Sequence, residues 1–217
     1  KRRRQGHRIV KQAKLFELAR FLLSNSGKET SYGKLAKNLE IGHNSTVSNW
    51  VRYLEQAYLF FKLDRFDFKL KSQFLSPKKF YSIDPGMHEA VSFKISRDFG
   101  RKMETIVAGE LFRQKAMTFG LEVYYWKDHQ QREVDFILKN GPRVEKLIQV
   151  SCAESADDIS PRELASLETA SSALGCNDMT VITWDCEGDV RIGKNKAILV
   201  PLWKWLLDNN YDNVAAP

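Results

Sequence analysis

The chain has 217 residues and a formal net charge of +7, and its 43% hydrophobic and 28% charged residues exclude a disordered chain and allow one large or two small folded domains. No run approaches the ~20 consecutive apolar residues that cross a bilayer, so we expect no membrane segment. Three widely spaced cysteines without a CxxC pair exclude a disulfide framework and a zinc site, which favours the reducing cytoplasm.

The beginning of the chain predicts a helix and its end. Apolar residues recur at helical spacing from His7 to Leu23, and the polar run 24–27 supplies a stop. The chain opens in the basic run 1–4 without an initiator Met, and we therefore expect residues upstream to be missing.

Two short helices joined by a tight, Gly-containing turn follow. Ser31 caps a helix over residues 32–38, and Asn44 or Ser45 caps a second helix over about residues 44–56. The second helix is expected to bury an apolar stripe and to leave a polar side exposed. The stripe consists of Val47, Val51 and Leu54. This order is typical of a helix-turn-helix.

Alternating apolar and polar residues then predict strands. The alternation covers residues 58–63 and 66–70, and a further strand is expected from Pro77 to Ile83. Such a hairpin, placed after the second helix, is typical of the wing of a winged helix. The basic residues of the wing and its flanks are Lys62, Arg65, Lys69, Lys71, Lys78 and Lys79.

A loop near residues 98–100 predicts a boundary between a first domain, 1–99, and a second, 100–217. In the second domain the spacing of apolar residues changes along the chain, from the spacing typical of helices to that typical of strands and back. Its expected elements are a helix over 101–119, strands over 121–126, 133–138 and 146–152, a helix over 161–174, a strand over 179–184, and a final strand passing into a Trp-rich helix over 197–207. The fold class is therefore α+β or α/β, with a small α/β sandwich in the second half.

The positive charge is concentrated in the first domain. Residues 1–99 carry 20 Lys and Arg against 9 Asp and Glu, a net charge of +11, whereas residues 100–217 carry 14 against 18, a net charge of −4. Such a local basic surface attracts a polyanion. We interpret the first domain as one that binds double-stranded DNA, with docking of a protein partner as the alternative. The expected DNA contacts are Asn44, Ser45, Thr46, Ser48, Asn49 and Arg52 on the second helix, and Lys69 and Lys71 on the wing.

Acidic residues of the second domain follow the layout of a PD-(D/E)xK nuclease, in which carboxylates hold a divalent cation and a lysine assists the attacking water. Glu104 lies on the first helix and Asp135 at the start of the second strand. Gln149 and Ser151 stand where the layout has a carboxylate and the lysine, so Glu104, Asp135 and Gln149 are interpreted as the remnant of a catalytic site. Weak Mg²⁺ binding by Glu104 and Asp135 stays an alternative. So does a substitute lysine from a neighbouring strand, at Lys127 or Lys139.

Several segments together carry a family resemblance. They are SYGKLAK at 31–37, TVSNWVRYLEQAYLF at 46–60, PKKFYSIDPG at 77–86, YWK at 125–127, REVDFIL at 132–138, LIQV at 147–150 and PLWKWLL at 201–207. In this order they resemble the C-terminal region of archaeal and bacterial AAA+-type ATPases, which holds a winged helix and a nuclease-like terminal domain. The resemblance implies a winged helix-turn-helix followed by a restriction-endonuclease-like α/β domain.

The resemblance also implies an ATPase module upstream, which would bind ATP and Mg²⁺ and be the covalent partner of this region. The chain contains no GxxxxGK[ST] sequence, so we assign no cofactor site to it. We expect a DNA-binding accessory region of an ATPase. The alternatives are an active metal-dependent nuclease and a protein-interaction module, and the oligomeric state is left open.

Overall fold

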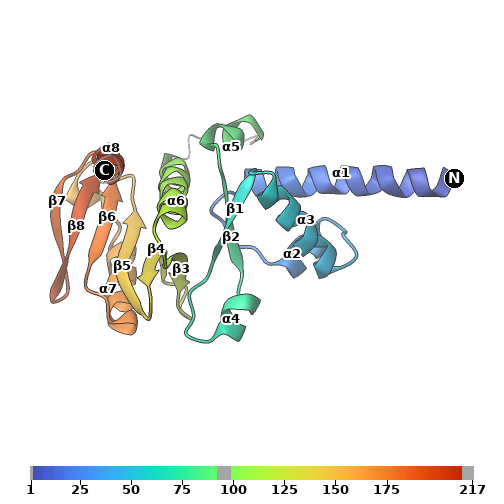
Figure 1. Ribbon diagram of the computed structural model, residues 1–217. Helices are drawn as coiled ribbons and strands as arrows, with labels where there is room; N and C mark the ends of the chain where they lie inside the picture. Colours follow the sequence, from blue (N-terminus) through green and yellow to red (C-terminus); the bar gives the residue numbers. More distant parts are fainter. Residues whose placement is uncertain (1, 92–98, 212–217) are drawn as a thin grey trace. The chain divides into compact units, whose positions relative to one another are not determined.

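The computed structural model describes the backbone of residues 2–91 and 99–211 (Figure 1). The fold is α+β, and the chain divides into two compact units. Unit 1 comprises residues 1–64 and 74–97, and unit 2 comprises residues 65–73 and 98–217. The division between 97 and 98 lies beside the predicted boundary, whereas the short segment 65–73, which joins unit 2 from within the first half, was not predicted.

Unit 1 combines four helices with a two-stranded antiparallel sheet among its described residues. Phe60 lies opposite Ser82 in this sheet, and Thr30 forms a further antiparallel bridge with Lys78. The elements in chain order are α1 (Arg2–Ser24), α2 (Tyr32–Asn38), α3 (Asn44–Gln56), β1 (Phe60–Asp64), β2 (Lys78–Ser82) and α5 (Pro85–Val91). Helix, bridge, two helices and two paired strands follow one another in the order of a winged helix-turn-helix.

The helix-turn-helix forms where the sequence predicts it. The Ser31 hydroxyl accepts the amide of Lys34 at 3.1 Å and caps α2. The predicted stripe of α3 is buried and contributes to a core that also holds Leu18, Leu35 and Phe80. The predicted cap of α3 by Asn44 or Ser45 is wrong: Asn44 is already helical, and the extended residue before it, His43, makes no side-chain cap bond.

The predicted strand over residues 66–70 is wrong. Its place is taken by bends and by α4 (Leu70–Leu75), so the two strands of the wing are joined by a long connection. The Phe66 amide donates to the Tyr125 carbonyl at 2.7 Å, and the Phe66 side chain is buried in the core of unit 2. The Asp67 carboxylate then accepts the amide of Lys69 at 2.8 Å, a local turn that competes with strand pairing.

The basic residues expected on the wing are only partly available at its surface. Lys78 and Lys79 are 5% and 2% exposed. Lys78 and Lys62 both pair with Asp64, at 3.1 and 3.5 Å. A buried cation is stable only when it is paired, so Lys62 and Lys78, held by Asp64, cannot present their charge freely to a phosphate backbone, and Lys79 is buried.

Unit 2 contains a mixed six-stranded sheet in the order β3-β4-β5-β6-β8-β7. The first three strands pair antiparallel, β5, β6 and β8 run parallel, and β7 is an antiparallel edge strand. The elements are α6 (Phe99–Met117), β3 (Leu121–Lys127), β4 (Glu133–Asn140), β5 (Arg143–Val150), a 3₁₀ turn (Ala156–Asp158), α7 (Pro161–Leu174), β6 (Met179–Thr183), β7 (Gly188–Ile192), β8 (Asn195–Pro201) and α8 (Leu202–Tyr211). No helix in the described ranges has the length and apolar content of a membrane span.

The two long helices of unit 2 pack on opposite faces of the sheet. Leu167 and Ala170 of α7 share a core with Leu147 and Val181 of the sheet. Side chains alternate between the faces of a strand, and the alternate residues are left for α6. Just beyond the end of β5, one such contact with α6 is seen directly. The Cys152 sulfur lies 3.6 Å from the sulfur of Met103 on α6. All predicted elements of this unit are present, and β7 is the one strand that was not predicted.

Candidate functional site

The exposed side of α3 is the candidate DNA interface. Asn44, Ser45, Asn49 and Arg52 are exposed there. The Arg52 guanidinium lies 5.8 Å from the centroid of the Tyr53 ring, and this ring is itself 53% exposed. Arg52 therefore lies beside an aromatic surface and keeps its donors toward solvent.

The other predicted contacts of the first half lie in different surroundings. Thr46 and Ser48 are half-buried, and the hydroxyls of Ser48 and Tyr32 share a hydrogen bond. Lys69 and Lys71 are exposed, but they belong to the segment 65–73 and to α4 instead of a wing strand. The structure thus gathers four of the eight predicted residues on one exposed helix side.

Charged and polar groups hold α3 against β1. Burial raises the pKa of Tyr32 and of Glu55. Burial alone would lower the pKa of Lys62, but Asp64, Tyr32 and Glu55 outweigh it, and the pKa of Lys62 is raised. Lys62 therefore stays charged between acidic and phenolic partners on α2, α3 and β1. This network fixes the orientation of α3 from its inner side.

In unit 2 the structure brings Asp135 and Gln149 together. They lie on β4 and β5 with 9% and 6% of their surface exposed. The Gln149 side-chain amide donates to Asp135 Oδ2 at 2.7 Å, and the Val150 backbone amide donates to the same oxygen at 2.9 Å. Two donors thus satisfy one oxygen of a buried carboxylate. The side-chain oxygen of Gln149 is buried without a hydrogen-bond partner among the described residues.

Glu163 joins this face of the sheet from the first turn of α7. Ser151 is two residues beyond Gln149, so both side chains point to the α7 face. Burial raises the pKa of Glu163, and hydrogen bonds from the Ser151 hydroxyl and the Ser160 amide offset this in part. Glu163 Oε2 is buried and has no hydrogen-bond partner among the described residues.

Glu104 comes from the helix on the other face. Its neighbour Met103 contacts Cys152, which places this turn of α6 beside the end of β5. Gly100, one turn earlier, also approaches Cys152, with 3.4 Å between the sulfur and an added Cβ. The convergence of Glu104 with Asp135 and Gln149 therefore stays a prediction.

The chemistry of the cluster departs from that of a metal-dependent nuclease. Within the described residues, no group of three or more His, Cys, Asp or Glu side chains is arranged to hold a metal ion. The two lysines considered as substitutes are engaged: Lys127 pairs with Glu133 at 3.1 Å, and Lys139 pairs with Glu122. The Gln149 amide supplies to Asp135 the hydrogen bond that a cation would replace, so the carboxylate is stabilised without one.

The sequence singles out Glu163 as part of a helix cap and not as part of a functional site. Ser160 and Glu163 have the S-x-x-E spacing of a capping box, and Ser160 does cap α7 by accepting the Arg162 amide. A glutamate at this position is expected as a surface cap. The half-buried position of Glu163 beside Ser151 follows from the packing of α7 on the sheet, which no local pattern encodes.

We expect Glu163→Gln to stabilise the protein most at high pH. The pKa of Glu163 in the folded state is raised above its ordinary value, so folding is favoured when the group is protonated and is opposed once pH exceeds the folded pKa. The variant should therefore melt about 2 °C above the unmodified chain at pH 8, and the two should converge near pH 4. A difference that stays constant across this range would contradict a buried, ionising carboxylate.

Two family models cover nearly the whole chain. Residues 4–98 match the model of a domain of unknown function, DUF8612, and residues 99–205 match that of a second domain of unknown function, DUF4143. The two matches meet at the position where the chain passes from unit 1 to unit 2 for the last time.

Two curated proteins are similar to the chain. An uncharacterized protein of Methanocaldococcus jannaschii, MJ1544, is 32% identical over 215 residues, which are 94% of this chain and 46% of that protein. An uncharacterized protein of Haemophilus influenzae is 27% identical over 128 residues, which are 57% of this chain and 30% of that protein. The chain thus spans half or less of the length of these relatives. No solved structure matches it.

Proposed function

We propose that unit 1 binds double-stranded DNA and that α3 is the helix that enters the major groove. The exposed polar side of α3, opposite its buried stripe, is the observation that carries this proposal. An α-helix fits the width of the major groove, and the first residues of the second helix usually contact base edges. In this arrangement Asn44 and Asn49 face bases, and Arg52 contacts a guanine or a phosphate.

The proposed interface is smaller than the sequence alone predicts. Ser48 is engaged with Tyr32, and we leave Lys69 and Lys71 out because they belong to the segment that packs into unit 2. Titration of a fluorescent duplex between 50 and 200 mM NaCl tests the proposal. A salt-dependent affinity supports it. An absence of binding at 50 mM NaCl would favour a helix-turn-helix that docks a protein partner.

We propose further that unit 2 is a nuclease-like domain that does not cleave DNA. Metal-assisted hydrolysis needs enough negative charge to hold the ion and a group that readies the water. Here a neutral amide, Gln149, donates to the acidic residue Asp135, and a serine stands at position 151.

We therefore expect no nicking of supercoiled plasmid by the chain with Mg²⁺ or Mn²⁺. The measurement compares the unmodified chain with Asp135→Ala at equal concentration on agarose gels. Nicking by the unmodified chain that disappears in the Asp135→Ala protein would overturn the proposal. Equal traces of nicking in both proteins would identify a contaminating nuclease.

For the longer protein we propose an ATPase module, binding ATP and Mg²⁺, to which this region is an accessory. The resemblance to AAA+-type ATPases and the 46% coverage of the archaeal relative support this assignment. ATP hydrolysis by that full-length relative, measured with and without duplex DNA, tests it. Hydrolysis that DNA accelerates is the expected result, and an inactive full-length protein would contradict it.

A further inference from the structure

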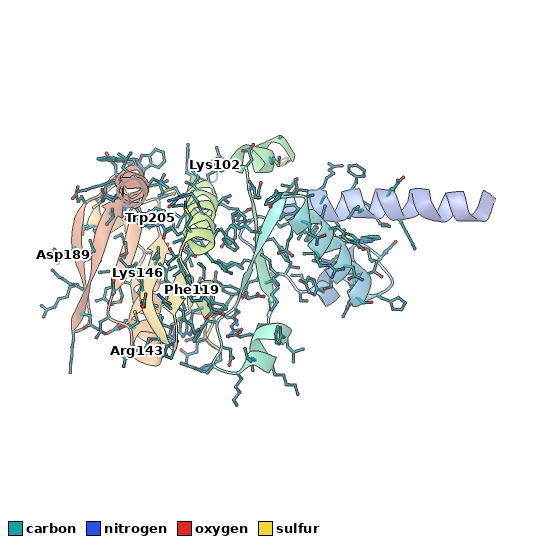
Figure 2. The ribbon with its side chains drawn as sticks, viewed as in Figure 1. Lys102, Phe119, Arg143, Lys146, Asp189 and Trp205 are labelled. Atoms are coloured by element: carbon teal, nitrogen blue, oxygen red, sulfur yellow. The ribbon has the colours of Figure 1, made fainter. Side chains whose placement is uncertain are left out.

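Unit 2 contains a pocket that is separate from the Asp135 cluster. Its volume is about 470 Å³, within the ~300–1,000 Å³ typical of small-molecule sites. Phe66 and Phe68 line it from the segment 65–73, and Tyr124, Val144 and Arg143 line it from the β3–β4–β5 part of the sheet. All of its lining residues belong to unit 2. Figure 2 labels Arg143.

One wall of the pocket is aromatic. The buried ring of Phe66 contacts Phe68 and Tyr124 edge to face, with ring centroids 5.2 and 5.7 Å apart. The Phe68 ring rests against Phe66 by one edge-to-face contact, and the residue is 78% exposed. An exposed ring offers its face to a flat partner, since stacked and edge-to-face arrangements of aromatic groups are both favourable.

The charges that line the pocket balance formally, with Asp67 and Glu122 against Lys139 and Arg143, but they are not all paired with one another. Glu122 accepts hydrogen bonds from Lys139 and from the Tyr124 hydroxyl, and these bonds, with that of Lys139 first, lower its pKa. Asp67 accepts the Lys69 amide. Glu122 is thus paired with a cation, whereas Asp67 is hydrogen-bonded by a neutral backbone amide and keeps its negative charge. The exposed side chain of Arg143 makes no ion pair or hydrogen bond with any described residue.

We propose that this pocket binds a planar aromatic ligand that carries a negative charge. The ring of the ligand stacks on Phe68, and its anionic group pairs with the guanidinium of Arg143, whose planar donor set matches carboxylate and phosphate oxygens. Mononucleotides and aromatic carboxylates share this chemistry. The proposal concerns unit 2 alone and does not depend on DNA binding by α3.

The test uses 8-anilinonaphthalene-1-sulfonate, a fluorescent aromatic sulfonate, as the probe. We expect the full chain to bind one equivalent, and we expect Phe68→Ala and Arg143→Glu each to weaken binding about tenfold. Phe16→Ala is the matched aromatic control, because Phe16 is 72% exposed on α1. Arg191→Glu on the exposed edge strand β7 is the matched charge control. Unchanged melting temperatures show that the variants are folded.

Competition distinguishes the two sources of the ligand. Displacement of the probe by AMP supports a mononucleotide, and displacement by 2-naphthoate supports an aromatic carboxylate. The proposal is overturned if neither displaces the probe. It is equally overturned if the Phe68 and Arg143 variants bind the probe as tightly as the two controls do.

Discussion

Arg52→Glu combined with Asn49→Ala is expected to weaken duplex DNA binding about 100-fold at 100 mM NaCl. Each direct contact to a base or phosphate contributes roughly 1–3 kcal/mol, and two lost contacts together correspond to about two decades in Kd. Both side chains are exposed, so the fold should be unaffected. Fluorescence anisotropy gives the affinity, and thermal melting checks the fold.

The matched control is Lys69→Glu combined with Lys71→Glu. This pair changes the net charge twice as much as Arg52→Glu does, yet we expect it to change the affinity less than about threefold, because both lysines belong to the segment 65–73 of unit 2 and lie outside the proposed interface. Equal losses in both double variants, with a smaller salt slope for the lysine pair, would show that the segment 65–73 also contacts DNA. An unchanged affinity of the Arg52 and Asn49 variant would remove α3 from the interface.

Gln149→Glu is expected to destabilise the protein by about 3 kcal/mol at pH 7.5, a decrease of roughly 10 °C in melting temperature. The substitution replaces a donor, 2.7 Å from Asp135 Oδ2, with a second buried carboxylate. The repulsion raises the pKa of the pair. Stability should therefore recover as pH falls and one proton is bound, and a urea titration at pH 5 and at pH 7.5 measures this recovery.

A divalent cation should restore the stability of the same variant. The carboxylates of Asp135 and of the new Glu at position 149 would offer oxygen ligands to Ca²⁺ or Mn²⁺. We expect 5 mM CaCl₂ to raise the melting temperature of Gln149→Glu by several degrees and that of the unmodified chain by less than about 1 °C, since only a ligand that binds the native state stabilises it. Gln149→Ala is the control that loses the amide without adding charge. An equal calcium shift in all three proteins would contradict the prediction.

The helix-turn-helix could be predicted nearly to the residue because its signals are local. Ser31 caps α2 through its own hydroxyl, and the spacing of Val47, Val51 and Leu54 encodes the buried side of α3 without reference to distant residues. The wing could not be predicted in this way. Phe66 and Phe68 alternate with polar residues as a strand does, but Phe66 enters a core built by residues more than fifty positions later.

In the candidate site, too, the residues placed by the strand order could be predicted, and the residue placed by the packing of a helix could not. Asp135 and Gln149 converge as the layout predicts, because β4 and β5 form an antiparallel hairpin whose register places them side by side. The half-buried position of Glu163 depends on how α7 packs on the sheet. The strand β7 alternates exposed Asp189 and Arg191 with Val190 and Ile192, which pack on the core, but at five residues it is short and was missed.

The segment 65–73 belongs to unit 2, although in the sequence it lies inside the first unit. The chain passes between them three times, at residues 64–65, 73–74 and 97–98. After a single cleavage between the two family matches, the segment 65–73 would stay covalently on the N-terminal fragment, although it packs with residues of the C-terminal fragment. A fragment that stops at residue 98 keeps Phe66 without the core that receives it, and a fragment that starts at residue 99 lacks the ring that fills its core. A gene fusion that exchanged one half for an unrelated domain would carry the same defect, so the two halves are expected to be inherited as a pair.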